Sequence, residues 1–264
     1  MNIIVCVKQV PNTNEVKINK ETGTLIREGV ESIINPDDKN AIEAALVLKE
    51  QVGAKVTLLS MGPPQAKAAL KEGLAMGADE AYLLSDRAFG GSDTWATATI
   101  IAAAIEKIGN YDVIFCGRQA IDGDTAQVGP EVAEFLGIPQ VTYAKDVKVD
   151  GQDILVTRYT ENADFVIRVK TPCLLTAIKE LNDPRFPTVA KILEVYDEQK
   201  DNIQVLTFAD IDVDPTQIGL KGSPTNVFRS FVPVKEKHSE FIEGSNENEK
   251  AKVLMEKLAA LKLI

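Results

Sequence analysis

A glycine-rich stretch, GRQAIDGDTAQVGP (117–130), carries the residue types best suited to ligand chemistry in this chain. It contains three glycines and two aspartates, and it lies between an apolar run, YDVIFCG, and an amphipathic run, EVAEFLGIP. Amides at the start of a helix point outward, and the helix dipole adds about half a positive charge there, so such a turn suits a phosphate or pyrophosphate.

Asp122, Asp124 and Thr125 are also residue types that cap helices, and Asp124 could instead accept a ribose hydroxyl. Pro130 suits the first turn of the helix. A capped surface turn and a nucleotide-binding turn both remain open.

Three further segments place polar residues at the expected ends of strands. FGGSDT (89–94) enters a helix and superficially resembles the SGGxDS loop of PP-loop adenylating enzymes, although it follows the third predicted strand and lacks the leading serine. INPDD (34–38) begins a helix, where its carboxylates could hold a ribose or cap the helix. SMGPP (60–64) ends a strand with Met61, which could pack on an adenine or fill the core. Neither GxGxxG nor GxxxxGK[ST] occurs, so the common dinucleotide and P-loop motifs are unsupported.

The rest of the composition excludes several classes of chemistry. The chain has one histidine, His238, in a polar segment, and its three cysteines form no CxxC motif. Zinc chemistry and acid–base hydrolysis therefore lack the side chains that they need, and we predict no metal site. Cys6 and Cys116 fall in apolar strand-like runs, where a buried, inert thiol is expected.

Charge and hydropathy restrict the partners and the compartment. A formal net charge of −10, with scattered acidic residues, argues against a nucleic-acid partner. No apolar run reaches the roughly 18 residues that a membrane span needs. The start, MNIIVCVKQV, has neither a basic region nor a cleavage site, so we expect no signal peptide and a reducing cytoplasm.

The elements that must position these segments alternate through the first half of the chain. Apolar runs at 2–7, 55–62, 80–84 and 111–117 predict buried strands, and the patterns at 35–53, 63–77 and 91–109 predict helices. Residues 16–29 predict a hairpin around Glu21–Gly23. Strands separated by helices indicate a parallel sheet covered on both faces, so the fold class is α/β.

The pattern changes after about residue 140. DVKVDGQDILVTRY and FVIRVKTPCLLTAI alternate in polarity, which is typical of antiparallel strands with one wet face. Residues 182–200 are amphipathic and interrupted by proline, 212–233 predict an extended arm, and 246–264 predict a helix whose Val253, Leu254, Leu258 and Leu261 form one stripe. We therefore divide the chain into a nucleotide-binding domain, 1–211, and an arm with a helix, 212–264, that contacts a partner subunit.

The polar segments converge on one edge of the predicted sheet. Each follows the carboxyl end of a predicted parallel strand, as does Cys6 at the end of the first. Ligands of open α/β sheets bind at that edge. A nucleotide cleft is therefore the favoured interpretation.

Several motifs, in this order, make the chain resemble the beta subunits of electron transfer flavoproteins. They are VCVKQVP, INPDDKNAIEAAL, SMGPPQA, LAMGADEAYLL, GRQAIDGDTAQVGPE, KTPCLLTA, NDPRFPT and GLKGSPT, and they span nearly the whole chain. The family signature fits at Pro172, Leu174, Leu175 and Thr176, whereas Asn162-Ala163 stand where the family usually has acidic or glycine residues.

The resemblance implies an adenine nucleotide alpha hydrolase-like α/β fold with an arm that embraces an alpha subunit. It also implies cofactor contacts from Cys6, Asn35, Pro36, Asp37, Asp38, Met61, Gly117, Arg118, Gln119, Ala120, Ile121, Asp122, Gly123, Asp124, Thr125, Ala126, Gln127 and Val128. In the family a recognition loop follows the Asn-x-Pro-Arg motif, here within 182–200, and Val189 matches its apolar anchor.

The form DGDTAQVGP resembles that of electron-bifurcating members, which hold a second FAD where other members hold a structural AMP. We therefore expect FAD, with AMP as the alternative in the same site, and NADH as the electron source, seated by Gly91, Ser92, Asp93 and Thr94. The implied partners are an alpha subunit with its own FAD, a flavin-linked dehydrogenase of the acyl-CoA or lactate type, and ferredoxin. The competing functions are a PP-loop or stress-type ATP-binding protein, an adenylating enzyme, and a non-bifurcating flavoprotein subunit with AMP.

Overall fold

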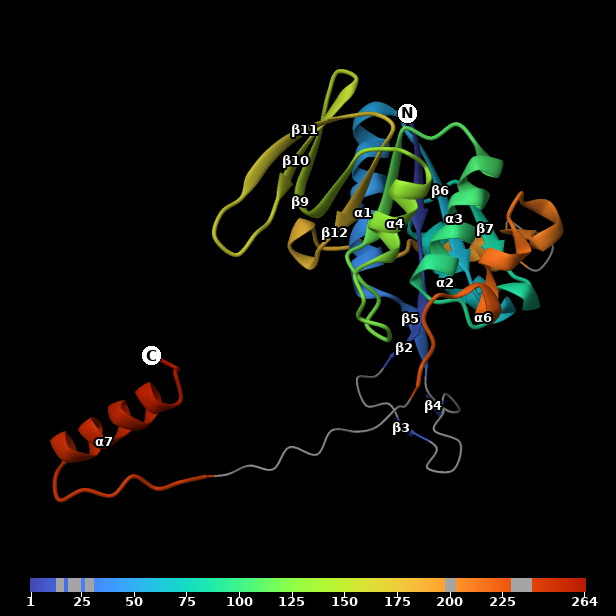
Figure 1. Cartoon of the computed structure of the whole chain (residues 1–264). Helices are drawn as coiled ribbons and strands as arrows, with labels where there is room; N and C mark the ends of the chain where they lie inside the picture. Colours follow the sequence, from blue (N-terminus) through green and yellow to red (C-terminus); the bar gives the residue numbers. More distant parts are fainter. Residues whose placement is uncertain (13–16, 19–24, 27–30, 198–202, 229–238) are drawn as a thin grey trace. The chain divides into compact units, whose positions relative to one another are not determined.

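A computed structural model describes residues 1–12, 17–18, 25–26, 31–197, 203–228 and 239–264 (Figure 1). It divides the chain into two compact units, Met1–Phe228 and Arg229–Ile264. Among the described residues, the first unit contains the sheet and the helices that cover it, and the second contains one helix.

The first unit is built on a nine-stranded, mostly parallel sheet within its described residues. The strand order is β11-β10-β9-β12-β8-β1-β6-β7-β13, and only the pairs of β10 with β9 and with β11 are antiparallel. The strands are β1 (Asn2–Cys6), β6 (Lys55–Met61), β7 (Glu80–Leu84), β8 (Val113–Gly117), β9 (Gln140–Asp150), β10 (Asp153–Arg158), β11 (Phe165–Lys170), β12 (Cys173–Ala177) and β13 (Ile203–Leu206). The predicted α/β class with an antiparallel region is confirmed.

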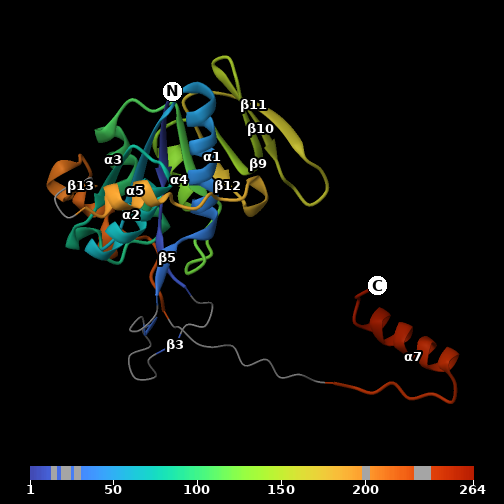
Figure 2. The same cartoon turned by 180° about the vertical axis from the view of Figure 1, so that it is seen from behind.

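Helices cover both faces because the central strands are apolar on both sides. Ile3 and Val5 of β1 face the cluster of α1 and α2, whereas Ile4 faces the cluster of α3 and α4. Figure 1 shows α3 and α4 in front of the sheet, and Figure 2 shows α1, α2 and α5 on the opposite side. The helices are α1 (Pro36–Val52), α2 (Lys67–Met76), α3 (Thr94–Ile108), α4 (Val128–Phe135), α5 (Val189–Val195) and α6 (Gly219–Gly222).

Most helix boundaries follow the sequence signals. Helix α1 begins at Pro36 and ends before Gly53, whose left-handed φ of 69° closes the helix. Helix α3 begins after Asp93, whose side chain accepts the amide of Ala96. The segment predicted as one helix at 63–77 opens instead with a 3-10 turn, Pro64–Ala66, before α2.

The prediction that FVIRVKTPCLLTAI forms antiparallel strands is wrong for its second half. Its first half is β11, which pairs antiparallel with β10 as expected. Its second half is β12, which lies between β8 and β9 and is parallel to both. All five residues of β12 are buried, so the short apolar run CLLTA, set off by Pro172, is a central strand rather than a half-wet one.

Two small ribbons precede α1. Strand β2 (Gln9–Pro11) pairs antiparallel with β5 (Ser32–Ile34), which the sequence did not predict. Strands β3 (Lys17–Ile18) and β4 (Leu25–Ile26) form the predicted hairpin, whose turn lies outside the described residues.

The C-terminal segment is divided differently from the predicted boundary between 211 and 212. Residues 212–228 belong to the first unit, and they contain a 3-10 turn, Pro215–Gln217, and α6 rather than an extended chain throughout. Burial of Ile218 and Ser223 holds this part on the domain. Residues 229–233 of the predicted arm, and His238, lie outside the described residues.

The second unit contains α7 (Glu247–Ala260), so the predicted helix at 246–264 is present with a shorter range. Asn246 caps it by accepting the amide of Glu249. Leu254 and Leu261 of the predicted apolar stripe are exposed. None of the helices in the described ranges is long and apolar enough to cross a bilayer.

Candidate functional site

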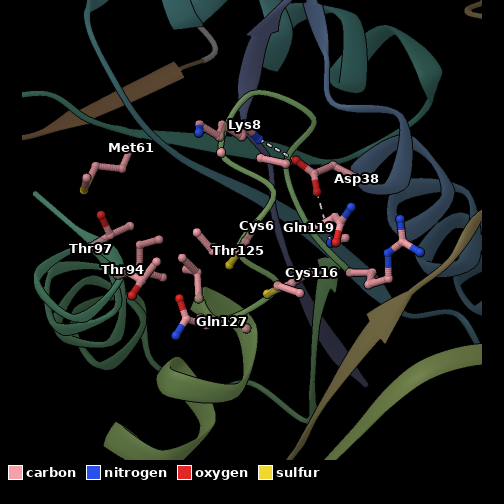
Figure 3. A pocket seen from close by; sticks show the side chains of 18 of the residues that line it. Cys6, Lys8, Asp38, Met61, Thr94, Thr97, Cys116, Gln119, Thr125 and Gln127 are labelled. Atoms are coloured by element: carbon pink, nitrogen blue, oxygen red, sulfur yellow. Dashed lines mark hydrogen bonds between the residues drawn. The ribbon is translucent and has the colours of Figure 1, made fainter. Parts of the chain in front are cut away.

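A cavity of about 530 Å³ opens at the carboxyl edge of the sheet (Figure 3). Its walls come from the ends of β1, β6 and β8, the first turns of α3, and the loop that leads into α4. Many predicted cofactor residues line it: Cys6, Asp38, Met61, Gly117, Arg118, Gln119, Ala120, Gly123, Asp124, Thr125, Ala126, Gln127 and Val128. Asn35, Pro36, Asp37, Ile121 and Asp122 do not line it.

The start of α4 faces this cavity without a side-chain cap. Gln127 occupies the N-cap position and makes no capping hydrogen bond. The expected capping residues bind elsewhere: Asp122 pairs with Lys8 Nζ at 2.7 Å, and Asp124 accepts a hydrogen bond from the side chain of Gln119. No side chain caps this helix, so the prediction that Asp122, Asp124 or Thr125 does so is wrong; the loop carries the carboxylates of Asp122 and Asp124 to other partners. No side-chain cap occupies the first amides of α4, and the one acidic residue of its first turn, Glu131, accepts a hydrogen bond from the Thr94 hydroxyl; uncapped amides suit an anionic ligand.

The loop before α4 holds two non-glycine residues in the left-handed region. Asp124 has a φ of 55° and Ala126 a φ of 54°. Each such residue costs on the order of 1 kcal/mol. Backbone strain of this kind is common at ligand sites, where the surrounding structure maintains it.

Asp38 joins the ends of two neighbouring strands beneath the cavity. Its Oδ2 accepts the amide of Lys8 at 2.7 Å, and its Oδ1 accepts the amide of Gly117 at 3.0 Å. Asn35 Nδ2 donates to the same Oδ1 at 3.0 Å. Burial raises the pKa of Asp38 to about 7, although these three hydrogen bonds favour the ionised form. Asp38 therefore organises the cavity wall.

Asn35 is buried and fastens the cavity loop from behind. Its Nδ2 donates to the carbonyl of Gln119 at 2.8 Å, and its Oδ1 accepts the amide of Ile121 at 3.1 Å. Asp37 lies 3.4 Å from Arg118 Nε; burial raises its pKa, and Arg118 partly offsets this. These contacts place Asn35 and Asp37 in the support of the loop, outside the cavity lining.

The start of α3 differs from the start of α4 because side chains accept hydrogen bonds from two of its amides. Asp93 caps the amide of Ala96 at 3.0 Å, and the amide of Asp93 donates to Ser223 Oγ at 2.8 Å. Thr225 donates to Asp93 Oδ2 from its amide at 2.9 Å and its hydroxyl at 2.7 Å. Burial opposes the charge of Asp93, but these hydrogen bonds outweigh it and lower the pKa of Asp93.

The loop at 91–94, the predicted NADH seat, lies only partly at the cavity. Ser92, Asp93 and Thr94 do line the cavity, but Gly91 packs under α6, where an added Cβ would lie 2.9 Å from Leu220 Cβ. A carboxylate already caps this helix start. Side chains thus occupy the amides of Asp93 and Ala96, and the NADH seat at this loop stays a prediction.

Several residues of the site were given no role from the sequence. Lys8, Thr97, Ile101 and Thr225 line the cavity, and Thr225 comes from the segment GLKGSPT, far along the chain. That motif was part of the family resemblance, but its spacing gave no sign of a contact with α3. Cys6 and Cys116 also lie side by side here, although 110 positions separate them.

Within the described residues, no group of three His, Cys, Asp or Glu side chains is arranged to hold a metal ion.

The predicted recognition loop, within residues 182–200, is anchored on α1 and exposes Val189. Asn40 and Asn182 hydrogen-bond to each other, and Arg185 binds both carboxylate oxygens of Glu43, at 2.8 and 2.9 Å. Val189 is the first residue of α5 and is 74% exposed, so it is no core residue. The anchor holds the segment while Val189 faces outward.

Comparison with known proteins identifies the family. The model of the electron transfer flavoprotein domain matches residues 22–211. The chain belongs to the electron transfer flavoprotein family, among its beta subunits. The electron transfer flavoprotein subunit beta of Thermoanaerobacterium thermosaccharolyticum is 57% identical over 258 residues, which cover 98% of both chains.

Two other relatives are named as parts of reductase systems. Subunit CarD of the caffeyl-CoA reductase-Etf complex from Acetobacterium woodii is 54% identical over 259 residues, or 98% of both chains. The acryloyl-CoA reductase electron transfer subunit gamma of Anaerotignum propionicum is 50% identical over 266 residues, again 98% of both chains. This membership decides against the ATP-using alternatives considered from the sequence.

The residues of the beta subunit's cavity fit an adenine nucleotide cofactor. The amides at the α4 start are suited to phosphate, and Leu59, Met61 and Ile101 supply apolar wall for a ring system.

Proposed function

We propose that this beta subunit binds FAD in the cavity and takes electrons from NADH for electron bifurcation between a dehydrogenase and ferredoxin. The observation that carries the proposal is the uncapped start of α4, which opens into a cavity of about 530 Å³ with apolar walls. This volume lies within the range of about 300–1,000 Å³ that is usual for small-molecule sites. Bound FAD would supply both hydride acceptance and single-electron transfer, which the side chains themselves cannot provide.

The chain's own groups would hold and orient the cofactor. The backbone from Ala126 to Gly129 would bind the pyrophosphate, because no side chain caps those amides. Leu59, Met61 and Ile101 would exclude water from the ring system. Asp38 would keep the ends of β1 and β8 at a fixed separation through its bonds to Lys8 and Gly117.

The choice of FAD over AMP rests on size and reach. Ala126 has a small side chain at the point where the left-handed backbone enters the cavity, so a ligand backbone can come close. The cavity also continues from Arg118 to Thr97 and Ile101 on α3. A mononucleotide would need less of this wall than a dinucleotide would.

NADH is proposed as the electron donor on chemical grounds. Hydride transfer needs the nicotinamide within roughly 3–3.5 Å of the acceptor, which is a positioning task that requires no histidine. Ser92 and Thr94 line the cavity and would be near such a ligand. Asp93 and Ser223 occupy the amides of Ala96 and Asp93, so a pyrophosphate seated there would have to use the remaining amides of the α3 start.

The proposed partners follow from the family and from exposed apolar residues. An alpha subunit with a second FAD would cover the exposed side of residues 212–228 and the apolar side of α7, where Leu254 and Leu261 are exposed. The names of the two reductase-linked relatives favour a flavin-linked dehydrogenase of the acyl-CoA type over a lactate type. Val189 would anchor the docking of that enzyme, and ferredoxin would be the second acceptor.

Anaerobic titration of the purified heterodimer with NADH tests the proposed direction of electron flow. We expect the flavin absorbance to bleach on addition of NADH, before any dehydrogenase is present. The matched titration uses a reduced dehydrogenase as the donor. Bleaching by the dehydrogenase but not by NADH would contradict the NADH assignment.

A further inference from the structure

Cys6 and Cys116 form a facing pair of thiols on the floor of the cavity. Cys6 ends β1 and Cys116 lies in β8, and the parallel register that pairs Val5 with Phe115 sets the two cysteines opposite each other. Figure 3 shows their sulfur atoms pointing toward one another, and both residues line the cavity. Neighbouring strands lie about 4.8 Å apart, which is within the range of about 4.4–6.8 Å between the Cα atoms of disulfides.

The two thiols differ in access. Cys6 is partly exposed at the cavity, so the expectation of a buried thiol is wrong for it, whereas Cys116 is buried as expected. A hydrogen bond with Cys6 raises the pKa of Cys116, and burial and the nearby Asp38 carboxylate raise it further. Cys116 therefore stays protonated and is reached through Cys6. The third thiol, Cys173, is buried in β12, where burial raises its pKa to about 12.

We propose that Cys6 and Cys116 are an oxidisable dithiol that a hydroperoxide converts into an intramolecular disulfide. Hydrogen peroxide would first oxidise the Cys6 thiol to a sulfenic acid, with release of one water. The Cys116 sulfur would then attack the Cys6 sulfur and pass its proton to the departing hydroxyl group, which forms the S–S bond and releases a second water. Two thiols are oxidised and one peroxide is reduced. This proposal rests on the facing thiols and does not depend on which nucleotide the cavity binds.

The bridge would act on the cavity wall because of where the two cysteines lie. An S–S bond is about 2.05 Å long, so the two sulfur atoms must come closer together than they are in a hydrogen bond. Cys6 is the last residue of β1, and Lys8, two residues later, is held by Asp38 and Asp122. Because the end of a strand moves more easily than its centre, the shift would fall on residues 6–8 and change the cavity floor.

The test is peroxide treatment of the purified heterodimer, followed by blocking of free thiols and non-reducing peptide mapping. We expect one new species that links the peptides of Cys6 and Cys116, lighter than the two reduced peptides by two hydrogen atoms and reversed by a dithiol reductant. Cys173, the internal control, should remain a free thiol. In Cys116→Ser, Cys6 should accumulate as a sulfenic acid that dimedone traps, whereas wild type should trap much less.

Several outcomes would overturn the proposal. These are oxidation of Cys6 to a sulfinic acid without a bridge, equal dimedone trapping in wild type and Cys116→Ser, or loss of Cys173 at the same rate as Cys6. If Cys116→Ser does not assemble, the wild-type heterodimer decides the question through a trivalent arsenical. That reagent must be held by both Cys6 and Cys116 if the thiols face each other, and modification of neither would contradict the facing pair.

Discussion

The carboxylate of Asp38 accepts the amide of Gly117 at 3.0 Å and so joins α1 to the end of β8. The other oxygen of Asp38 accepts the amide of Lys8 at 2.7 Å, just beyond the end of β1. One buried side chain thus fixes the two strand ends between which the cavity opens. This contact therefore fixes the position at which the loop after Gly117 begins.

Replacement of Gly117 by alanine should disrupt this junction. An added Cβ would lie 2.2 Å from Asp38 Oδ1 and 2.8 Å from the amide nitrogen of Asp38, so the loop or α1 must shift. We expect a loss of about 1–3 kcal/mol in the free energy of unfolding, and a lower content of bound nucleotide. Chemical denaturation and quantification of released nucleotide measure the two effects.

Gly123→Ala is the matched control for Gly117→Ala. Gly123 lies in the same loop, but an added Cβ meets nothing within 4 Å and its φ is not left-handed. Its effect on stability should stay within about 0.5 kcal/mol. An equal loss of unfolding free energy in the two variants would show that the contact between Gly117 and Asp38 does not explain the effect of an added Cβ in this loop.

Stability should depend on pH through Asp38. Its pKa is about 7 in the folded chain and near 3.8 in the unfolded chain, so the folded state binds more protons between these values. The free energy of unfolding should therefore fall as pH rises from about 4 to about 7, by at most ~1.4 kcal/mol per pH unit, and then level off. Asp38→Asn should lose this component, whereas Asp146→Asn, at a half-exposed carboxylate far along the chain, should keep it. Parallel pH curves for wild type and Asp38→Asn would contradict the assignment.

The segment from α6 to Thr225 should loosen when Thr225 loses its hydroxyl. Thr225→Val removes a 2.7 Å hydrogen bond to Asp93, worth about 1 kcal/mol, and leaves the amide bond in place. Hydrogen exchange of the Leu220 and Gly222 amides should then speed up about fivefold. Thr216→Val is the control, because it removes a 2.7 Å bond to Asp214 that does not reach α3. Equal exchange in both variants would mean that Asp93 does not hold this segment.

Electron transfer to the dehydrogenase should depend on Val189. Val189→Asp places a charge where an apolar anchor is proposed, so transfer should slow by tenfold or more while bound flavin is unchanged. Val166→Asp on the edge strand β11 is the control, since Val166 is 72% exposed against 74% for Val189. Transfer that slows equally in both variants, or in neither, would remove Val189 from docking.

Much of this fold could be predicted because its signals are local. Asn35-Pro36 and Gly53 mark the ends of α1, and the apolar runs of the first half mark parallel strands. Strand β12 is wrongly predicted to be antiparallel, because CLLTA follows an alternating segment in the sequence. Only its pairing with β8 shows that it is a central parallel strand.

The candidate site likewise has a part that local sequence signals predict and a part that they do not. The sequence placed the loop at 117–128 at the cavity, since its neighbours define a strand end and a helix start. It could not show that Asp93 binds Thr225, because 132 positions separate them, nor that Asp124 leaves α4 uncapped. Those facts depend on side-chain direction in the folded loop, which no local pattern determines.

Identification of the nucleotides released from the denatured heterodimer tests the central claim most directly. The uncapped α4 start and the small Ala126 predict a dinucleotide in the beta subunit, in addition to the FAD of the alpha subunit. Chromatography and mass spectrometry of the released fraction should therefore find two FAD and no AMP per heterodimer. One FAD and one AMP would contradict the account.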